Sequence, residues 1–401
     1  MNVTIFPSTV HGSVSAPPSK SMAHRYLIAA GLCQGKSIVH GLAPSQDILA
    51  TIDCLKAMGA TVDFNGHMAE ITGTNPITSS GDTILPCRES GSTLRFFIPL
   101  CLLSRNPHTL TGYGRLLERP QEIYRSLCRE KGYVFQQTTD AITVQGPLQS
   151  GNYTLAGNVS SQFVTGLLYA LPFTQGDSTI TLLPPVESRS YIQLTLSALQ
   201  AFGVEAHWSN ETTLFVKKGS YHATEITVEG DYSNAAFLDA FNYLGSNVSV
   251  TGLNPQSLQG DRVYEQGFAE LKKCNATISL ADCPDLGPIY MAMAAALHGA
   301  TFTHTARLKM KESDRGAAMA QELAKFGINT TLNNNSIVVH PSPLKAPTQP
   351  LNGHNDHRIV MALATLCTLV GGTITDAEAV SKSFPDYFQV ITSLGVSLKE
   401  V

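Results

Sequence analysis

The feature that most constrains the fold of this chain is a pattern that recurs six times along its 401 residues. Each copy has a helical segment with apolar residues at helical spacing, then a small residue, then an alternating strand. Five copies carry glycine at the junction, namely Gly59, Gly132, Gly203, Gly327 and Gly395. Glycine suits the positive φ with which helices commonly end. The remaining copy has Cys274 followed by Asn275, and asparagine also tolerates that conformation.

The spacing of these junctions indicates how the chain is divided. They recur at intervals of roughly 70 residues, with one shorter interval, and units of this size are too long for solenoid repeats. Six such units indicate internal duplication of a larger β/α unit. We therefore predict an α/β protein with mixed sheets, in two domains of three units each. The switch between the domains is expected near residues 228–231.

Composition excludes several classes of function. Charged residues make up 14% of the chain, the net charge is −4, and no basic tail or run is present. This argues against a nucleic-acid-binding protein. The eight cysteines are scattered without a CxxC pair, which indicates buried thiols in a reducing compartment and neither zinc ligands nor disulfides. No HExxH, GxxxxGK[ST] or strand-linked GxGxxG pattern is present.

Nothing in the sequence indicates a secreted or membrane protein. Residues 1–8 read as a strand and lack the pattern of a signal peptide. The longest apolar run, residues 359–370, is too short to span a bilayer. We expect a soluble, cytoplasmic protein that does not act at a membrane.

The stretch from Lys311 to Arg315 carries two cations and two carboxylates ahead of an amphipathic helix expected over residues 317–326. Helical spacing would put Lys311, Asp314 and Arg315 on one face, with Glu312 to one side. Such a group at a helix N-terminus can bind an anion and exchange a proton with it. For this stretch taken alone, a solvated, charge-rich first turn is the alternative.

Comparable stretches precede apolar segments elsewhere in the chain. Their polar or glycine members are Lys20, Ser21, Arg25, Gly91, Arg119, Ser160, Ser161, Gln162, Ser188, Tyr191, Asp285, Arg358 and Lys382. Apolar helices are expected over residues 96–103, 163–171 and 289–297. Each stretch could be a plain helix cap, and a capping role for Asp285 would need no further function. If the helix termini face a common cleft, they favour a small, multiply anionic substrate.

Taken in order, the motifs P-S-K-S-x-x-x-R, S-S-Q-F, K-E-S-D-R, N-D-H-R and K-S-F-P-D-Y resemble those of the 5-enolpyruvylshikimate-3-phosphate synthases, in the enolpyruvyl transferase family. The resemblance runs from Lys20 to Phe388. It implies an inside-out α/β barrel of two domains, each with three βαβαββ units. The domains would span residues 19–228 and residues 1–18 with 229–401, with the active site in the cleft between them.

The resemblance also implies a reaction and its residues. The enolpyruvyl group of phosphoenolpyruvate would pass to the 5-hydroxyl of shikimate 3-phosphate through a tetrahedral ketal. The residues implied for shikimate 3-phosphate are Lys20, Ser21, Arg25, Ser160, Ser161, Gln162, Ser188, Tyr191, Asp285 and Lys311. Those implied for phosphoenolpyruvate are Lys20, Gly91, Arg119, Gln162, Arg315, Arg358 and Lys382.

Four residues are implied to be catalytic. Asp285 would act as base toward the 5-hydroxyl, and Glu312 would donate a proton to the methylene carbon, with Lys20 and Lys311 assisting. Neither a metal nor an organic cofactor is needed for this chemistry, and we expect a monomer whose only partners are the two small substrates.

Two alternatives stay open. One is the sister transferase that acts on UDP-N-acetylglucosamine, which usually begins with S-K-N and carries a cysteine in a mobile loop. The corresponding residues 114–123 contain no cysteine here. The other is a non-catalytic phosphometabolite-binding protein, against which the presence of Lys20, Asp285 and Glu312 argues.

Overall fold

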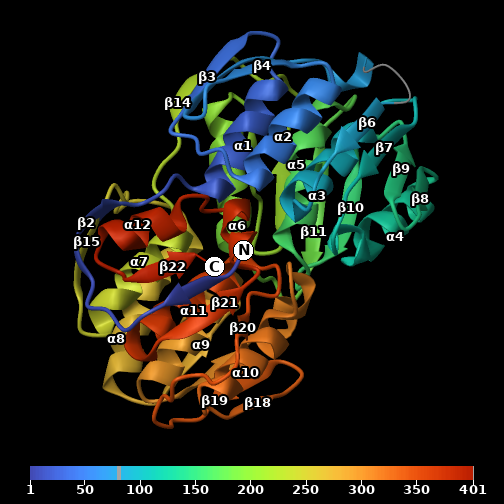
Figure 1. Ribbon diagram of the computed structural model, residues 1–401. Helices are drawn as coiled ribbons and strands as arrows, with labels where there is room; N and C mark the ends of the chain where they lie inside the picture. The colour runs from blue at the N-terminus through green and yellow to red at the C-terminus, as the bar shows by residue number, and fades with distance from the viewer. Residues whose placement is uncertain (79–82, 401) are drawn as a thin grey trace. The chain divides into compact units, whose positions relative to one another are not determined.

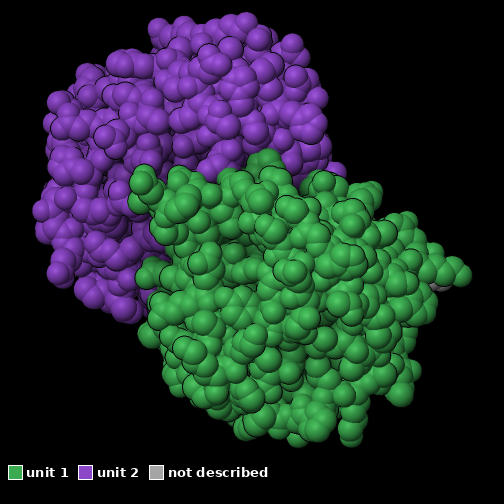
Figure 2. Space-filling model, turned by 90° about the vertical axis from the view of Figure 1, so that its left-hand side faces the viewer, with its two compact units in different colours: residues 1–19, 230–401 green, residues 20–229 purple. Residues whose placement is uncertain are grey.

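The computed structural model describes residues 1–78 and 83–400 of the chain (Figure 1). The chain divides into two compact units, coloured separately in Figure 2. Unit 1 contains Met1–Ser19 and Gly230–Val401, and unit 2 contains Lys20–Glu229. Each unit has an apolar core of its own.

Among the described residues, unit 2 has three four-stranded sheets that share one topology. In each sheet one neighbouring pair of strands is parallel, and two further strands join antiparallel. The strand orders are β14(Glu225–Thr227)-β3(Lys36–His40)-β5(Met68–Thr72)-β4(Thr61–Phe64), β6(Thr83–Pro86)-β7(His108–Thr111)-β9(Ala141–Gln145)-β8(Val134–Gln137) and β10(Asn152–Ala156)-β11(Ser178–Leu183)-β13(Thr213–Val216)-β12(Ala206–Trp208).

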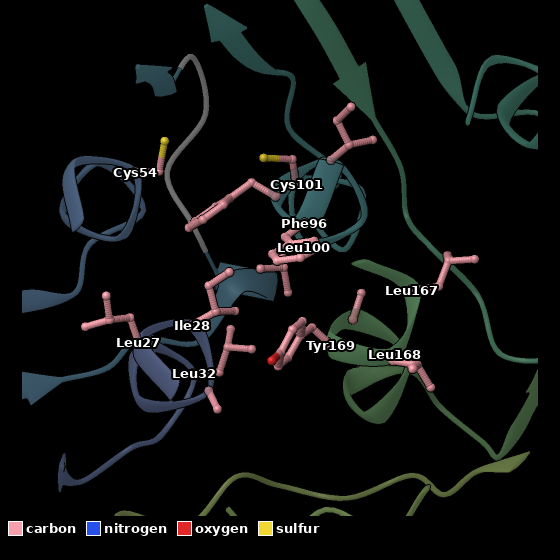
Figure 3. Packing of buried hydrophobic residues seen from close by; sticks show 14 of the residues in the cluster. Leu27, Ile28, Leu32, Cys54, Phe96, Leu100, Cys101, Leu167, Leu168 and Tyr169 are labelled. Atoms are coloured by element: carbon pink, nitrogen blue, oxygen red, sulfur yellow. The ribbon is translucent and has the colours of Figure 1, made fainter. Parts of the chain in front are cut away.

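Helices contribute much of the apolar core of unit 2. They are α1(Lys20–Gly31), α2(Gln46–Ala57), α3(Gly91–Cys101), α4(Glu122–Lys131), α5(Ser161–Ala170) and α6(Arg189–Ala201). Helices α3 and α5 cross between parallel strands and are buried along nearly their whole length, whereas α4 buries only one face. Figure 3 shows Ile28 of α1, Phe96 and Leu100 of α3, and Tyr169 of α5 meeting in the core.

Unit 1 repeats this arrangement with one shortened sheet. Within the described ranges its strand orders are β20(Leu351–Asn352)-β21(Gly372–Thr375)-β1(Val3–Ile5)-β22(Leu398–Glu400), β16(Ala276–Ser279)-β17(Ala300–Thr303)-β19(Ser336–Val339)-β18(Thr330–Leu332) and the parallel pair β15(Asn247–Thr251)-β2(His11–Ser15). Strand β1 lies between β21 and β22, so the first strand of the chain is paired with the last two.

The helices of unit 1 follow the same division into buried and amphipathic. They are α7(Tyr232–Tyr243), α8(Tyr264–Lys273), α9(Gly287–Ala296), α10(Arg315–Lys325), α11(His357–Val370) and α12(Tyr387–Ser393). Helices α9 and α11 cross between parallel strands and are almost fully buried, while α8 and α10 each expose a polar face. Short 3₁₀ helices η5(Pro284–Leu286), η6(Ala306–Met310) and η7(Ala377–Lys382) precede or follow them.

The six predicted helix-to-strand junctions are present, and the predicted α/β class with mixed sheets is confirmed. All five junction glycines have positive φ, between 75° and 103°. Cys274 is different, because it ends α8 in an extended conformation with φ of −162°. The fourth junction therefore turns without a left-handed residue at Cys274.

Two expectations about local structure are wrong. Helix α3 begins at Gly91 and not at residue 96, because Ser90 caps it by accepting a hydrogen bond from the Thr93 amide at 3.3 Å. The hydroxyl-rich stretch is thus the first turn of the helix and not a turn before it. Cys274 is exposed, whereas the other seven cysteines are buried as predicted. In the part of the chain that is described, no helix has both the length and the apolar character needed to span a bilayer.

Candidate functional site

The guanidinium of Arg315, the first residue of α10, is surrounded by carboxylates from three segments of the chain. Arg315 Nη1 lies 2.8 Å from Asp285 Oδ1, and Nη2 lies 2.7 Å from Glu312 Oε2. Nε lies 2.9 Å from Asp356 Oδ2. Burial alone would lower the pKa of Arg315, but Asp356, Glu312 and Asp285 outweigh burial and raise it. Arg315 is therefore a permanent cation enclosed by three carboxylates.

Asp285 and Glu312, the two groups expected to exchange protons, are bound by the two terminal nitrogens of this guanidinium. The Arg315 side chain is 1% exposed, but Asp285 is 18% and Glu312 16% exposed. A guanidinium is planar and rigid, so it fixes the separation of the two carboxylates. The arrangement presents two carboxylates to solvent side by side on a buried support.

Asp285 is not a helix cap, and the capping alternative is wrong. It lies in η5, and the N-cap of α9 is Leu286, which makes no side-chain capping bond. The Asp285 carboxylate instead faces cations. Oδ1 lies 3.0 Å from Lys311 Nζ, and Oδ2 accepts a hydrogen bond from Arg358 Nη2 at 3.2 Å.

These cations control the ionisation of Asp285. Burial raises the pKa of Asp285, but Arg358, Lys311 and Arg315 together outweigh burial and bring it well below its usual value. Asp285 is consequently ionised at neutral pH, and its carboxylate can act as a proton acceptor.

Lys311 reaches the site from outside the helix, so the prediction that it shares a helical face with Asp314 and Arg315 is wrong. Its backbone is extended, with φ of −92° and ψ of −162°. Asp314 then caps α10 by accepting a hydrogen bond from the Ala317 amide at 3.1 Å, which fixes the helix start at Arg315. Burial lowers the pKa of Lys311; Asp285 opposes this effect and Arg315 adds to it.

The start of α11 supplies two groups that sequence reasoning did not assign. Asp356 is the N-cap and accepts from the Arg358 amide at 3.0 Å, but its carboxylate also binds Ser313 Oγ and Arg315. The carbonyl of Asn355 accepts a hydrogen bond from Lys382 Nζ at 2.7 Å. The N-D-H-R motif marks Asp356 as a cap, but its second role depends on a contact 41 residues away that no local pattern encodes.

In unit 2, helix α1 begins at Lys20. Lys20 Nζ lies 2.9 Å from Asp47 Oδ2, and the two side chains are 14% and 11% exposed. Asp47 lies in the first turn of α2, which Ser45 caps. Asp47 was not assigned from the sequence, although its position after a capping serine is visible there.

Arg25 is buried and is held by neighbouring elements. Its Nε donates to Thr195 Oγ1 at 3.0 Å, and Nη2 donates to the Tyr191 carbonyl at 2.9 Å, both on α6. Nη1 donates to the Ser21 carbonyl at 2.7 Å. Three predicted residues, Ser21, Arg25 and Tyr191, are therefore joined directly. Burial lowers the pKa of Arg25.

The N-terminus of α3 lies directly against Arg119. A Cβ atom on Gly91 would be 2.4 Å from Nη1 of Arg119, so the guanidinium occupies the space that a side chain would need. Gln162 of α5 joins the same region, because its Nε2 donates to Ser92 Oγ at 2.9 Å and its Oε1 accepts from Arg95 Nη1 at 2.7 Å. Gly91, Arg119 and Gln162 thus form one surface.

The predicted serines differ in their local roles. Ser160 is the N-cap of α5 and accepts from the Gln162 amide at 3.3 Å, so the capping alternative describes its role here. Ser161 is buried in the first turn. Ser188 is the N-cap of α6 with φ of 57°, but its hydroxyl makes no capping hydrogen bond. Its left-handed backbone is uncommon for serine and is the kind of strain found at binding sites.

The structure joins the predicted residues within each unit. In unit 1, ion pairs join Asp285, Lys311, Glu312, Arg315 and Arg358 in one cluster. In unit 2, Arg25 and its partners form one group, and Gly91 with Arg119 and Gln162 forms another. Among the described residues, no group of three His, Cys, Asp or Glu side chains is arranged to hold a metal ion.

Comparison with protein families gives a match over nearly the whole chain. The profile described as EPSP synthase (3-phosphoshikimate 1-carboxyvinyltransferase) matches residues 6–391. A 3-phosphoshikimate 1-carboxyvinyltransferase of Clostridium novyi is 36% identical over 432 residues, covering 100% of this chain and 98% of that protein. The enzyme of the same name from Clostridium kluyveri is 36% identical over 428 residues, covering 99% and 98%.

Solved structures give the same fold. The EPSP synthase of Acinetobacter baumannii superposes with a TM-score of 0.78 at 22% identity, covering 99% of each chain. The enolpyruvyl transferase NikO of Streptomyces tendae superposes with a TM-score of 0.79 at 13% identity, covering 100% of this chain and 98% of that one.

Proposed function

Because this chain belongs to the EPSP synthase family, we propose that it transfers the enolpyruvyl group of phosphoenolpyruvate to the 5-hydroxyl of shikimate 3-phosphate. The products are phosphate and 5-enolpyruvylshikimate 3-phosphate, on the shikimate pathway to chorismate and the aromatic amino acids. The observation that supports this most directly is the placement of Asp285 and Glu312 on one guanidinium.

The reaction needs an acid and a base near one carbon atom. Glu312 first takes up a proton from solvent and then donates it to the methylene carbon C-3 of phosphoenolpyruvate, which leaves positive charge at C-2 and a carboxylate on Glu312 that Arg315 stabilises. Asp285 accepts the proton of the 5-hydroxyl as that oxygen bonds to C-2, giving a tetrahedral ketal. The ketal then returns a proton from C-3 to the Glu312 carboxylate and expels phosphate from C-2, which restores the double bond. The proton held by Asp285 passes to the departing phosphate, so both side chains regain their starting state. Lys20 and Lys311 assist the proton transfers.

Substrate binding can raise the basicity of Asp285. In the ligand-free chain its pKa is held down by Arg358, Lys311 and Arg315. Arg358 is also assigned to phosphoenolpyruvate, whose phosphate and carboxylate compete with Asp285 for it. As Arg358 turns toward the substrate, the carboxylate loses part of its stabilisation and becomes a better base.

Arg315 has a more specific role than general anion binding. Four of its five N–H groups donate to Asp285, Glu312 and Asp356 in the described structure. It therefore orients the two reacting carboxylates. Its positive charge is also assigned to phosphoenolpyruvate, together with Lys20, Arg119, Arg358 and Lys382.

The residues assigned to the acceptor are mostly hydroxyl-bearing or cationic. Lys20, Ser21, Arg25, Ser160, Ser161, Gln162, Ser188 and Tyr191 are assigned to shikimate 3-phosphate, together with Asp285 and Lys311. Hydroxyl groups and cations suit a phosphorylated polyol. We also propose that the protein is a cytoplasmic monomer that needs neither a metal nor an organic cofactor. The seven buried free thiols support a reducing compartment.

Phosphate release tests this function. The protein is mixed with phosphoenolpyruvate alone, with added shikimate 3-phosphate, and with UDP-N-acetylglucosamine in its place. Release with shikimate 3-phosphate only is expected. Release with the nucleotide sugar would favour the sister transferase, and no release with either acceptor would favour a non-catalytic binding protein.

A further inference from the structure

Glu322 is a fully buried carboxylate that the proposed chemistry does not use. It lies on α10, and its side chain is 0% exposed. Its Oε2 accepts hydrogen bonds from Lys325 Nζ and from the Asn352 amide, both at 2.8 Å, and Oε1 lies 3.0 Å from His354 Nε2. Burying a carboxylate is costly unless it is well paired, so three partners on one carboxylate indicate a specific role.

Two of these partners belong to a strained turn. His354 has φ of 52° and Asn355 has φ of 49°, so two successive non-glycine residues are left-handed. Such a conformation is unfavourable for a residue with a side chain and persists only where its surroundings fix it. Glu322 provides that fixation, because it binds the turn at the Asn352 amide and at the His354 ring.

The far side of the same turn holds groups of the cluster around Arg315. The Asn355 carbonyl accepts from Lys382 Nζ at 2.7 Å. The next residue, Asp356, accepts from Arg315 Nε at 2.9 Å. The turn therefore has the buried Glu322 on one side and two residues assigned to phosphoenolpyruvate on the other.

Two residues of helix α10 form hydrogen bonds with the turn or with the residue that follows it. Arg315 and Glu322 are separated by seven residues, which is nearly two helical turns, and so they lie on one face about 10 Å apart. Arg315 binds Asp356, which follows the turn, and Glu322 binds Asn352 and His354 within it. Movement of the turn would shift the Asn355 carbonyl away from Lys382.

We propose that Glu322 is a positioning residue for the phosphoenolpyruvate subsite, acting through the strained turn at residues 352–355 on Lys382 and Arg315. This inference rests on the proposed function, which assigns those two cations to phosphoenolpyruvate. Glu322 touches no substrate and transfers no proton. It fixes the positions of Lys382 and Arg315 before the substrate binds.

The test compares Glu322→Gln with Glu270→Gln, the same substitution on α8 of the same unit, where the hydrogen bond that the carboxylate accepts from Gln266 is exposed. For Glu322→Gln we expect KM for phosphoenolpyruvate to rise at least tenfold, KM for shikimate 3-phosphate to change less than twofold, and hydrogen exchange of the Asn352 amide to accelerate. Glu270→Gln should leave all three unchanged. A merely structural role would affect both KM values alike.

A second pair of variants keeps the proposal testable if Glu322→Gln does not fold. His354→Gln can still donate a hydrogen bond to Glu322, whereas His354→Ala cannot, and both keep a non-glycine residue at the strained position. His354→Ala should raise KM for phosphoenolpyruvate, and His354→Gln should restore it in large part. Equal KM values in the two variants would overturn the proposal.

The outcomes separate this inference from the proposed function. Faster exchange at Asn352 with an unchanged KM for phosphoenolpyruvate would overturn the positioning role. A wild-type protein that releases no phosphate would overturn the proposed function instead. The claim that Glu322 fixes the turn can still be tested in that case. It would be overturned if the Asn352 amide of Glu322→Gln exchanged hydrogen at the wild-type rate.

Discussion

Replacing Gly91 by alanine tests whether the start of α3 and Arg119 form one binding surface for phosphoenolpyruvate. The added Cβ would lie 2.4 Å from Nη1 of Arg119. Gly91 is not among the glycines with positive φ, so alanine is compatible with its backbone. The clash therefore falls on the end of a flexible side chain, and we expect the guanidinium to move while the helix stays in place.

The size of the effect follows from this contact. Ordinary van der Waals contact begins at 3.4 Å, so the guanidinium has to retreat by about 1 Å. Such a shift is enough to break a hydrogen bond of normal length between the Arg119 guanidinium and bound phosphoenolpyruvate. A hydrogen bond between charged groups contributes about 1.5–3 kcal/mol, which corresponds to a rise of about 10- to 150-fold in KM for phosphoenolpyruvate. The free energy of unfolding should change by less than about 1 kcal/mol, because alanine is a good helix former.

Initial rates of phosphate release, with each substrate varied in turn, measure both KM values, and urea unfolding measures stability. Gly219→Ala is the matched control in unit 2, because a Cβ there would meet no atom within 4 Å. It should leave both KM values unchanged. A Gly91→Ala variant with wild-type KM for phosphoenolpyruvate, or with a large loss of stability instead, would refute the reasoning.

Three further predictions concern stability and pH. Thr51→Val breaks a buried chain of hydrogen bonds in which Thr51 Oγ1 lies 2.7 Å from His24 Nδ1 and 2.8 Å from Thr93 Oγ1, so urea unfolding should show a loss of about 1–3 kcal/mol; an unchanged midpoint would contradict this. Burial raises the pKa of Asp285, but the neighbouring cations lower it by more, so the folded pKa lies below the unfolded value of about 3.9. The stability that ionised Asp285 contributes is therefore present above the unfolded pKa and is lost as the pH falls through the folded pKa. The difference in stability between wild type and Asp285→Asn should therefore narrow below about pH 4, and a constant difference would count against the ion pairs. Burial lowers the pKa of Lys311, so kcat should decline on the alkaline side below the ordinary lysine pKa of about 10.4, and Lys311→Arg should move that decline to higher pH; a decline that stays in place would remove Lys311 from the assignment.

The repeated architecture could be predicted because its signals are local. A glycine at a helix end requires only the conformation of one residue, and Gly59, Gly132 and Gly327 have the positive φ that their positions predict. Apolar helices such as α9 were also recognised, although it begins two residues earlier than predicted, at Gly287. Pro288 in the first turn is the local signal of this start, since Leu286 at the N-cap makes no side-chain capping bond.

The details of the charge cluster could not be predicted, because they depend on contacts between distant segments. Lys311 was expected on a helical face, but it meets Asp285 from an extended segment. Asp356 carries the signature of a cap and also holds Arg315, which only the fold reveals. Asp47 and Glu322 likewise gain their roles from partners that sequence spacing does not bring together.

The central claim is that Glu312 delivers a proton to C-3 of phosphoenolpyruvate while Asp285 takes one from the acceptor hydroxyl. Transfer of solvent deuterium tests it most directly, with wild type and Glu312→Gln incubated in D₂O with both substrates and the methylene group followed by NMR. We predict deuterium in the product methylene of wild type, only when shikimate 3-phosphate is present, and a loss of about 10²- to 10⁴-fold in the rate of incorporation for Glu312→Gln. Incorporation by Glu312→Gln at the wild-type rate would contradict the account.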